Sequence, residues 1–105
     1  MCKRIRALRT RRDIAARVAR ISHFEAMLQA LQTVVSNDTA PQETLLALRE
    51  TAKALGAYYG SDNWKRDLAA DEAGLLPDDL MRGVLSEDGI YNALEAYRER
   101  LEPSR

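Results

Sequence analysis

Hydrophobic positions in the first half of the chain recur every three or four residues. Between Asp13 and Val35 four apolar side chains stand seven residues apart: Ile14, Ile21, Leu28 and Val35. Because an α-helix turns once in about 3.6 residues, side chains at these intervals share one face. The pattern predicts an amphipathic helix over roughly residues 13–35.

A second amphipathic helix is predicted from about Pro41 to Tyr59. Its apolar positions follow the same spacing of three and four: Leu45, Leu48, Ala52, Leu55 and Tyr59. The intervening residues, 36–41, are mostly turn formers and include a proline, so they should form a loop. Two amphipathic helices with so short a connection are expected to pack as an antiparallel hairpin.

Turn residues then divide the chain into shorter helices. Gly60 has no Cβ and can end the second helix in a left-handed conformation. Ser61 or Asp62 can cap a third helix, because a short polar side chain accepts hydrogen bonds from the first free backbone N–H groups. Gly74 is the expected end of that helix.

Two more helices are predicted near the C-terminus. Pro77 and the two acids that follow it favour a helix of one or two turns through Met81, since acids stabilise a helix N-terminus. Ser86 is the expected cap of a last helix, which carries an apolar stripe as far as Leu101.

No run of residues alternates apolar and polar side chains, so no strand is predicted. We therefore expect an all-α fold, in which a long antiparallel helical hairpin (residues 13–59) is followed by short helices and a C-terminal helix, packed as a small bundle. Neither half can bury its apolar stripe alone. Residues 1–105 should thus form a single helical domain, with a basic, frayed extension over 1–12 and a compact helical half over 60–105.

The segment that begins at Tyr58 carries a recognisable pattern. Its residues are Tyr58-Tyr59-Gly60-Ser61, Trp64, Asp67, Asp71-Glu72-Ala73-Gly74, Leu76-Pro77, Asp79-Leu80, Gly83-Val84-Leu85-Ser86-Glu87-Asp88 and Tyr91. The pattern resembles an uncharacterised family of small bacterial helical proteins, known only as a domain of unknown function. The resemblance is specific over residues 58–94 and general upstream. It implies a fold and a size but no activity, and the arginine-rich start of this chain departs from it.

Composition narrows the possible chemistry. The chain has 105 residues, of which 46% are hydrophobic and 30% are charged, values typical of a globular protein. One Cys and one His exclude an intrachain disulfide and a Cys/His zinc site. The sequence contains no phosphate-binding loop, dinucleotide-binding turn or nucleophile elbow. We therefore expect no enzymatic activity, no cofactor and no metal.

The sequence also lacks an apolar stretch long enough for a signal peptide or a membrane-spanning helix. Its single cysteine, Cys2, leaves no pair that would require an oxidising compartment. We expect a cytoplasmic protein without membrane insertion.

The net charge of zero conceals a separation of charge along the chain. Residues 1–20 hold eight Lys or Arg and one acid, whereas residues 58–105 hold eleven acids and six bases. A basic segment can bind nucleic acid by releasing counterions, or it can pair with an acidic protein surface, including that of a second copy. The expected nucleic-acid contacts are Arg4, Arg6, Arg9, Arg11, Arg12, Arg17 and Arg20.

The second half contains candidate contacts for a protein partner: Trp64, Asp67, Asp71, Glu87 and Asp88. Asp67 and Asp71 lie four residues apart on one helical face. Such a pair can bind a divalent cation or divide acid and base roles, but an arginine from another helix would neutralise it equally well.

Three functional hypotheses follow, in decreasing order of support. The first is a small protein-binding or adaptor protein, for which the heptad-like first helix favours a homodimer. The second is a nucleic-acid-associated protein that uses the arginine-rich N-terminal segment. The third is a metal protein or enzyme built on Asp67 and Asp71.

Overall fold

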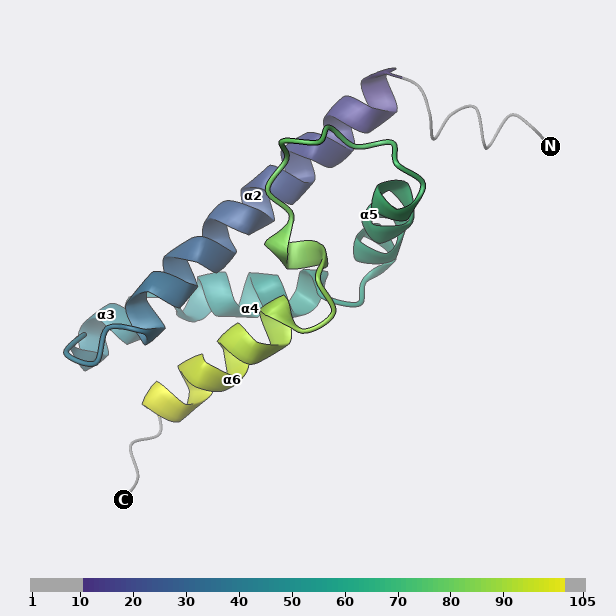
Figure 1. The fold of residues 1–105 in the computed structure, drawn as a ribbon. Coiled ribbons are helices and arrows are strands. Elements are labelled where there is room, and N and C mark those ends of the chain that lie inside the picture. The colour runs from purple at the N-terminus through teal and green to yellow at the C-terminus, as the bar shows by residue number, and fades with distance from the viewer. Residues whose placement is uncertain (1–10, 102–105) are drawn as a thin grey trace.

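A computed structural model of the chain describes residues 11–101, which form five α-helices and one 3-10 helix and contain no strand (Figure 1). The elements are α2 (Arg11–Val35), α3 (Gln42–Ala47), α4 (Arg49–Tyr58), α5 (Asp62–Glu72), η1 (Gly83–Leu85) and α6 (Gly89–Leu101). The prediction of an all-α fold is confirmed. The predicted N-terminal extension falls largely on residues 1–10, outside the described part of the chain, and Arg11 and Arg12 already belong to α2.

The longest helix, α2, forms one side of the molecule, and the later elements pack along it (Figure 1). It contacts α4, α6 and η1, while α6 also packs against α3 and α4. The segment between α5 and η1 passes over α2 before the chain turns back to α6. Within residues 11–101, no helix combines the length and the apolar content needed to cross a lipid bilayer.

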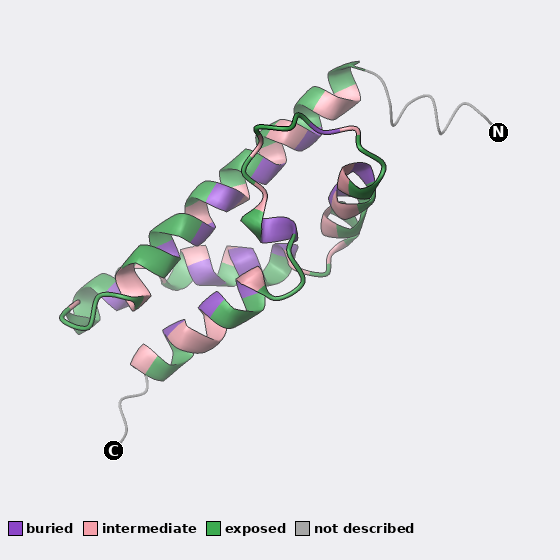
Figure 2. Ribbon diagram, viewed as in Figure 1, coloured by how far each residue is buried: buried purple, intermediate pink, exposed green. Residues whose placement is uncertain are grey.

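The hydrophobic core lies on the inner faces of these helices (Figure 2). The fully buried apolar side chains are Ile21, Leu28, Leu31, Leu45, Leu55, Val84 and Ile90. Burial of each such side chain stabilises the fold by roughly 1.5–3 kcal/mol relative to exposure. Because they come from both halves of the sequence, the hairpin and the C-terminal half share one core.

The second arm of the hairpin is not one helix, as the sequence predicts, but two helices that meet at Leu48. The backbone of Leu48 leaves helical geometry at φ −95° and ψ 9°. The Tyr97 hydroxyl of α6 donates a 2.6 Å hydrogen bond to the Leu45 carbonyl, which also accepts the Leu48 N–H at 3.0 Å. A side chain that binds a backbone carbonyl competes with the helical N–H four residues later, and the helix is interrupted at that point.

The prediction of a short helix at residues 77–81 is also wrong, because these residues form a turn. The Leu80 N–H donates to the Pro77 carbonyl at 3.2 Å. The guanidinium of Arg82 donates to the carbonyls of both residues, at 3.1 Å for Leu80. These carbonyls therefore receive hydrogen bonds without a helix, and Gly83 begins η1 rather than ending a helix.

The predicted helix boundaries around α5 are confirmed. Gly60 and Gly74, which follow α4 and α5, have positive φ values of 81° and 74°. The Ser61 hydroxyl caps α5 by accepting the Trp64 N–H at 3.1 Å. These local signals place α5 so that Asp67 faces α2.

Candidate functional site

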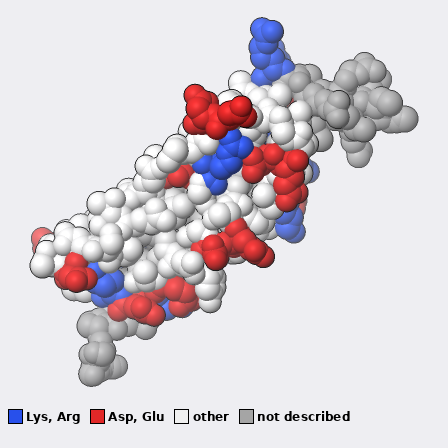
Figure 3. Space-filling model, in the orientation of Figure 1, with Lys and Arg blue, Asp and Glu red and all other residues white. Residues whose placement is uncertain are grey.

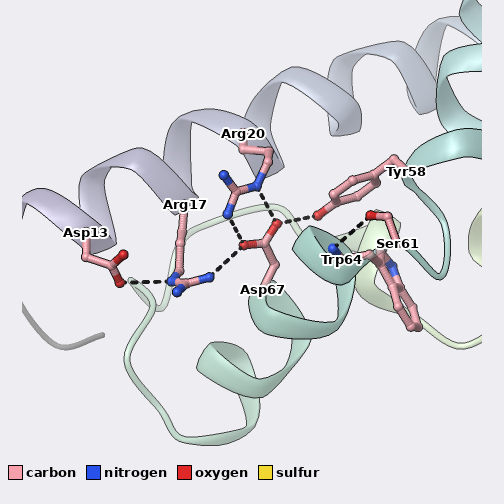
Figure 4. A network of polar contacts seen from close by, with 7 residues as sticks. All are labelled: Asp13, Arg17, Arg20, Tyr58, Ser61, Trp64 and Asp67. Carbon is pink, nitrogen blue, oxygen red and sulfur yellow. Dashed lines mark hydrogen bonds and ion pairs between the residues drawn. The ribbon is translucent and has the colours of Figure 1, made fainter. Parts of the chain in front are cut away.

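A buried charge cluster joins α2, α4 and α5, and its centre is Asp67 (Figure 4). The Asp67 side chain has no exposed surface. Arg20 holds both carboxylate oxygens, with Nε at 2.9 Å from Oδ2 and Nη2 at 2.6 Å from Oδ1. Arg17 Nη1 donates to Oδ1 at 3.2 Å. Such two-pronged contacts combine charge with fixed geometry, so they fix α5 against α2.

Arg17 links the central carboxylate of the cluster to a second acid. Arg17 is 4% exposed and also donates Nε to Asp13 at 3.0 Å. Among residues 11–101, the two arginines and two aspartates of the cluster carry equal and opposite charge. Burial of a charge is costly unless it is paired in this way, so the four side chains stabilise the fold only as a set.

Tyr58, the last residue of α4, supplies the remaining contact to the central carboxylate. Its hydroxyl donates to Asp67 Oδ2 at 2.7 Å, and its ring stacks on Phe24 at a centroid separation of 4.1 Å. Burial, together with the hydrogen bond to the Asp67 carboxylate, raises the pKa of Tyr58 above its ordinary value. The phenol thus stays protonated and remains a donor.

The cluster changes the interpretation of the basic N-terminal sequence. Arg17 and Arg20, two of the seven expected nucleic-acid contacts, have guanidinium groups that bind Asp67 instead. Arg11 and Arg12 are exposed at the start of α2. The remaining three, Arg4, Arg6 and Arg9, lie outside the described residues.

The two aspartates proposed as a paired site bind different arginines. Asp71 forms an ion pair with Arg82, whereas Asp67 binds the two arginines of α2. Within residues 11–101, no group of three or more His, Cys, Asp or Glu side chains is arranged to hold a metal ion. The geometry thus assigns both aspartates a role in packing.

The other expected contact residues differ in exposure. Trp64 is half-buried, and its Nε1 donates to the Val84 carbonyl at 2.8 Å, so it helps to hold η1 against α5. Glu87 and Asp88 are exposed. Of the predicted set, only these two acids are exposed.

A groove lies between α2 and the segment 77–81, with a volume of about 450 Å³. Its lining residues are Val18, Ser22, Glu25, Ala26, Gln29, Pro77, Asp79, Leu80 and Met81. Met81 is 62% exposed, the largest fraction among the large apolar side chains of the described chain. The groove thus combines apolar walls with two carboxylates.

Glu25 is the buried acid of this groove, with 8% exposure. Its Oε1 accepts the Val84 N–H at 3.0 Å, and its Oε2 accepts the Gln29 amide at 3.1 Å. Gly83 makes room for the carboxylate, since a Cβ there would lie 3.2 Å from Oε2. Sequence reasoning missed Glu25, although an acid four residues after Ile21 on the apolar face of α2 was a usable signal.

The surroundings of the groove are acidic. Residues 71–88 contain six acids and one base, Arg82. Figure 3 shows acidic side chains gathered over α5 and the connecting segment, whereas the side of α2 in the same view is largely uncharged. A negative potential around the groove attracts cationic groups and repels anions.

Comparison with known proteins gives one match. A family model described as "Domain of unknown function (DUF4298)" matches residues 21–103. The matched range includes Tyr58, Asp67 and the whole groove segment 77–81, and it begins after Arg20. No curated protein and no solved structure matches the chain.

Proposed function

The chain belongs to the DUF4298 family, and from the geometry we propose that it is a protein-binding module without an enzymatic reaction of its own. Its docking surface is the groove between α2 and the segment 77–81. The proposal covers two kinds of partner, a second copy of the chain and a different protein.

The observation that carries this proposal is the exposure of Met81 beside apolar groove walls. A methionine that is 62% exposed adjoins Leu80 and Val18 in the lining. Contiguous exposed apolar surface is unfavourable in water, and in soluble proteins it marks contact sites for other proteins. Methionine suits such a surface because its flexible side chain adapts to different partners.

The other exposed large apolar residues lie elsewhere. Leu46 on α3 is 47% exposed and Tyr91 on α6 is 53% exposed, but neither lines the groove. They therefore provide matched controls, because a change there alters exposed apolar surface without altering the groove.

The test is affinity capture from a nuclease-treated lysate of the source organism. The Met81→Glu variant places a charge at the groove, and Leu46→Glu places the same charge at an exposed position on α3. We expect a protein that the wild type and Leu46→Glu both retain, and that Met81→Glu loses at least tenfold. Equal recovery of every protein by the wild type and Met81→Glu would reject the groove as the docking surface.

Association with nucleic acid is a second candidate function, and two exposed arginines support it. Arg11 and Arg12 are exposed at the start of α2, next to a basic stretch of sequence. The double variant Arg11→Gln/Arg12→Gln should weaken a mobility shift of DNA or RNA and lower its dependence on salt concentration. If neither nucleic acid shifts with the wild type at low salt, this candidate is rejected.

A further inference from the structure

We propose that the groove recognises a cationic side chain, arginine or lysine, of the partner protein and that the charged head group binds at Glu25. This inference rests on the proposed function, to which it adds the chemical group that is recognised. The groove is thus a site for a side chain with an apolar stem and a positive end.

The carboxylate of Glu25 is the first reason. Both of its hydrogen-bond donors, the Val84 N–H and the Gln29 amide, are neutral groups. Within residues 11–101, the ion pairs of the structure join other residues, and no lysine or arginine pairs with Glu25. A carboxylate with 8% exposure has lost most of its hydration, so a cation beside it gains more than it would at an exposed acid.

The contrast with Asp67 strengthens this reason. Both acids are buried and both face the interface between α2 and the second half of the chain. Asp67 binds two arginines of its own chain, whereas the negative charge of Glu25 has no such counterpart among the described residues. Glu25 also lines the groove between α2 and the segment 77–81, which is open to solvent.

The shape and charge of the lining are the second reason. Val18, Leu80 and Met81 offer apolar surface for the methylene stem of a lysine or arginine, which packs well on such surface while its head group binds an acid. Asp79, exposed in the same lining, adds a second negative charge. Together with the acidic surroundings, these charges favour a basic partner over an acidic or purely apolar one.

The direct test is an NMR titration of the ¹⁵N-labelled full chain with N-acetyl-argininamide and N-acetyl-citrullinamide. The two compounds share one stem, but only the first carries a positive charge. We expect argininamide to shift the amide signals of Glu25, Gln29 and Val84 in a saturable way, and citrullinamide to bind at least tenfold more weakly. Equal responses to the two compounds, or shifts confined to other regions, would overturn the inference.

The variant Glu25→Gln tests whether the carboxylate of Glu25 binds the cation. Glutamine retains an acceptor oxygen for the Val84 N–H but carries no charge. It should bind N-acetyl-argininamide at least tenfold more weakly than the wild type, while Glu99→Gln, at an exposed position on α6, should bind it as the wild type does. Wild-type affinity in Glu25→Gln would exclude Glu25 as the recognition group.

Two further measurements separate a loss of folding from a loss of binding, and failure of this inference from failure of the proposed function. The dispersed ¹⁵N spectrum of Glu25→Gln reports whether it folds, and if it does not, Asp79→Asn at the exposed rim replaces it with the same expected direction of change. Failure of the proposed function is seen separately, as insensitivity of partner capture to Met81→Glu. A partner that depends on Met81 but is retained equally by Glu25→Gln would overturn this inference alone.

Discussion

The phenolic hydroxyl of Tyr58 donates a 2.7 Å hydrogen bond to Asp67, whose side chain has no exposed surface. The two residues stand on successive helices, on either side of the turn at Gly60. Arg20 of α2 binds the same carboxylate, so one buried acid links three helices. This contact fixes α5 in place, and the chain continues from α5 to the groove segment.

Replacement of Asp67 by Asn should strongly destabilise the fold. The change leaves Arg20 without its charged partner and Arg17 with Asp13 alone, in a largely buried site where the loss of one member of an ion pair costs about 3–5 kcal/mol. Urea unfolding followed by circular dichroism measures the change in the free energy of unfolding.

Asp71→Asn, one helical turn further along α5, is the matched control. Its ion pair with Arg82 is partly exposed, with side-chain exposures of 24% for Asp71 and 29% for Arg82. Its loss should therefore cost about 1 kcal/mol or less. Equal effects of the two substitutions would contradict the central role of Asp67.

The stability of the protein should fall as the pH rises above about 10. Burial, with the hydrogen bond to Asp67, raises the pKa of Tyr58, and burial raises the pKa of Tyr97. Unfolded tyrosines lose their protons near pH 10, whereas both of these lose theirs at higher pH in the folded state. The native state then binds more protons than the unfolded state, so the free energy of unfolding decreases with pH, by up to about 1.4 kcal/mol per pH unit for each tyrosine.

The Tyr58→Phe variant tests whether Tyr58 causes this decline in stability with pH. It should be less stable than the wild type at neutral pH, because it lacks the hydrogen bond to Asp67, but its stability should decline less steeply between pH 10 and 11. Denaturant unfolding at several pH values gives both quantities. An unchanged slope in the variant would show that Tyr58 does not cause the decline.

Alanine substitution at two glycines should have opposite effects on stability. At Gly89 an added Cβ would lie 2.5 Å from the Ser86 hydroxyl and 2.6 Å from the Gly83 carbonyl oxygen. The backbone must shift to accept it, which should cost roughly 1–3 kcal/mol. At Gly56, inside α4, a Cβ would meet Leu94 at 3.6 Å, an ordinary contact.

Gly56→Ala should therefore stabilise the protein by about 0.5–1 kcal/mol, because alanine loses less backbone entropy in a helix. Thermal unfolding of the two variants beside the wild type is the measurement. A Gly89→Ala protein as stable as Gly56→Ala would mean that the turn at residues 83–89 is looser than described.

Glu25→Ala should weaken the attachment of η1 to α2. The substitution leaves the buried Val84 N–H without its acceptor, which costs about 1–3 kcal/mol. Glu25→Gln keeps an acceptor oxygen and should lose less. Amide hydrogen exchange at Val84, measured for both variants, should accelerate more in the alanine protein, and equal exchange rates in the two would contradict this role.

Much of the local structure was predictable because its causes lie close together in the sequence. The apolar repeat defined α2, and the turn residues defined the two ends of α5. Gly60 and Gly74 adopt the left-handed conformation that only a residue without a side chain takes readily. The candidate site was less predictable, since its lining joins α2 to residues 77–81 and its buried acid, Glu25, binds the N–H of Val84, 59 residues away.

The sequence by itself determined the helical class, the first helix and the charge separation, and it limited the cap of α5 to Ser61 or Asp62. Only the tertiary structure decided the break at Leu48, where Tyr97 of α6 takes the Leu45 carbonyl. It also decided that Arg17 and Arg20 turn inwards to Asp67. The physical reason is the same in both cases: a polar group that packing removes from water binds whichever partner the fold brings to it, however distant in the chain.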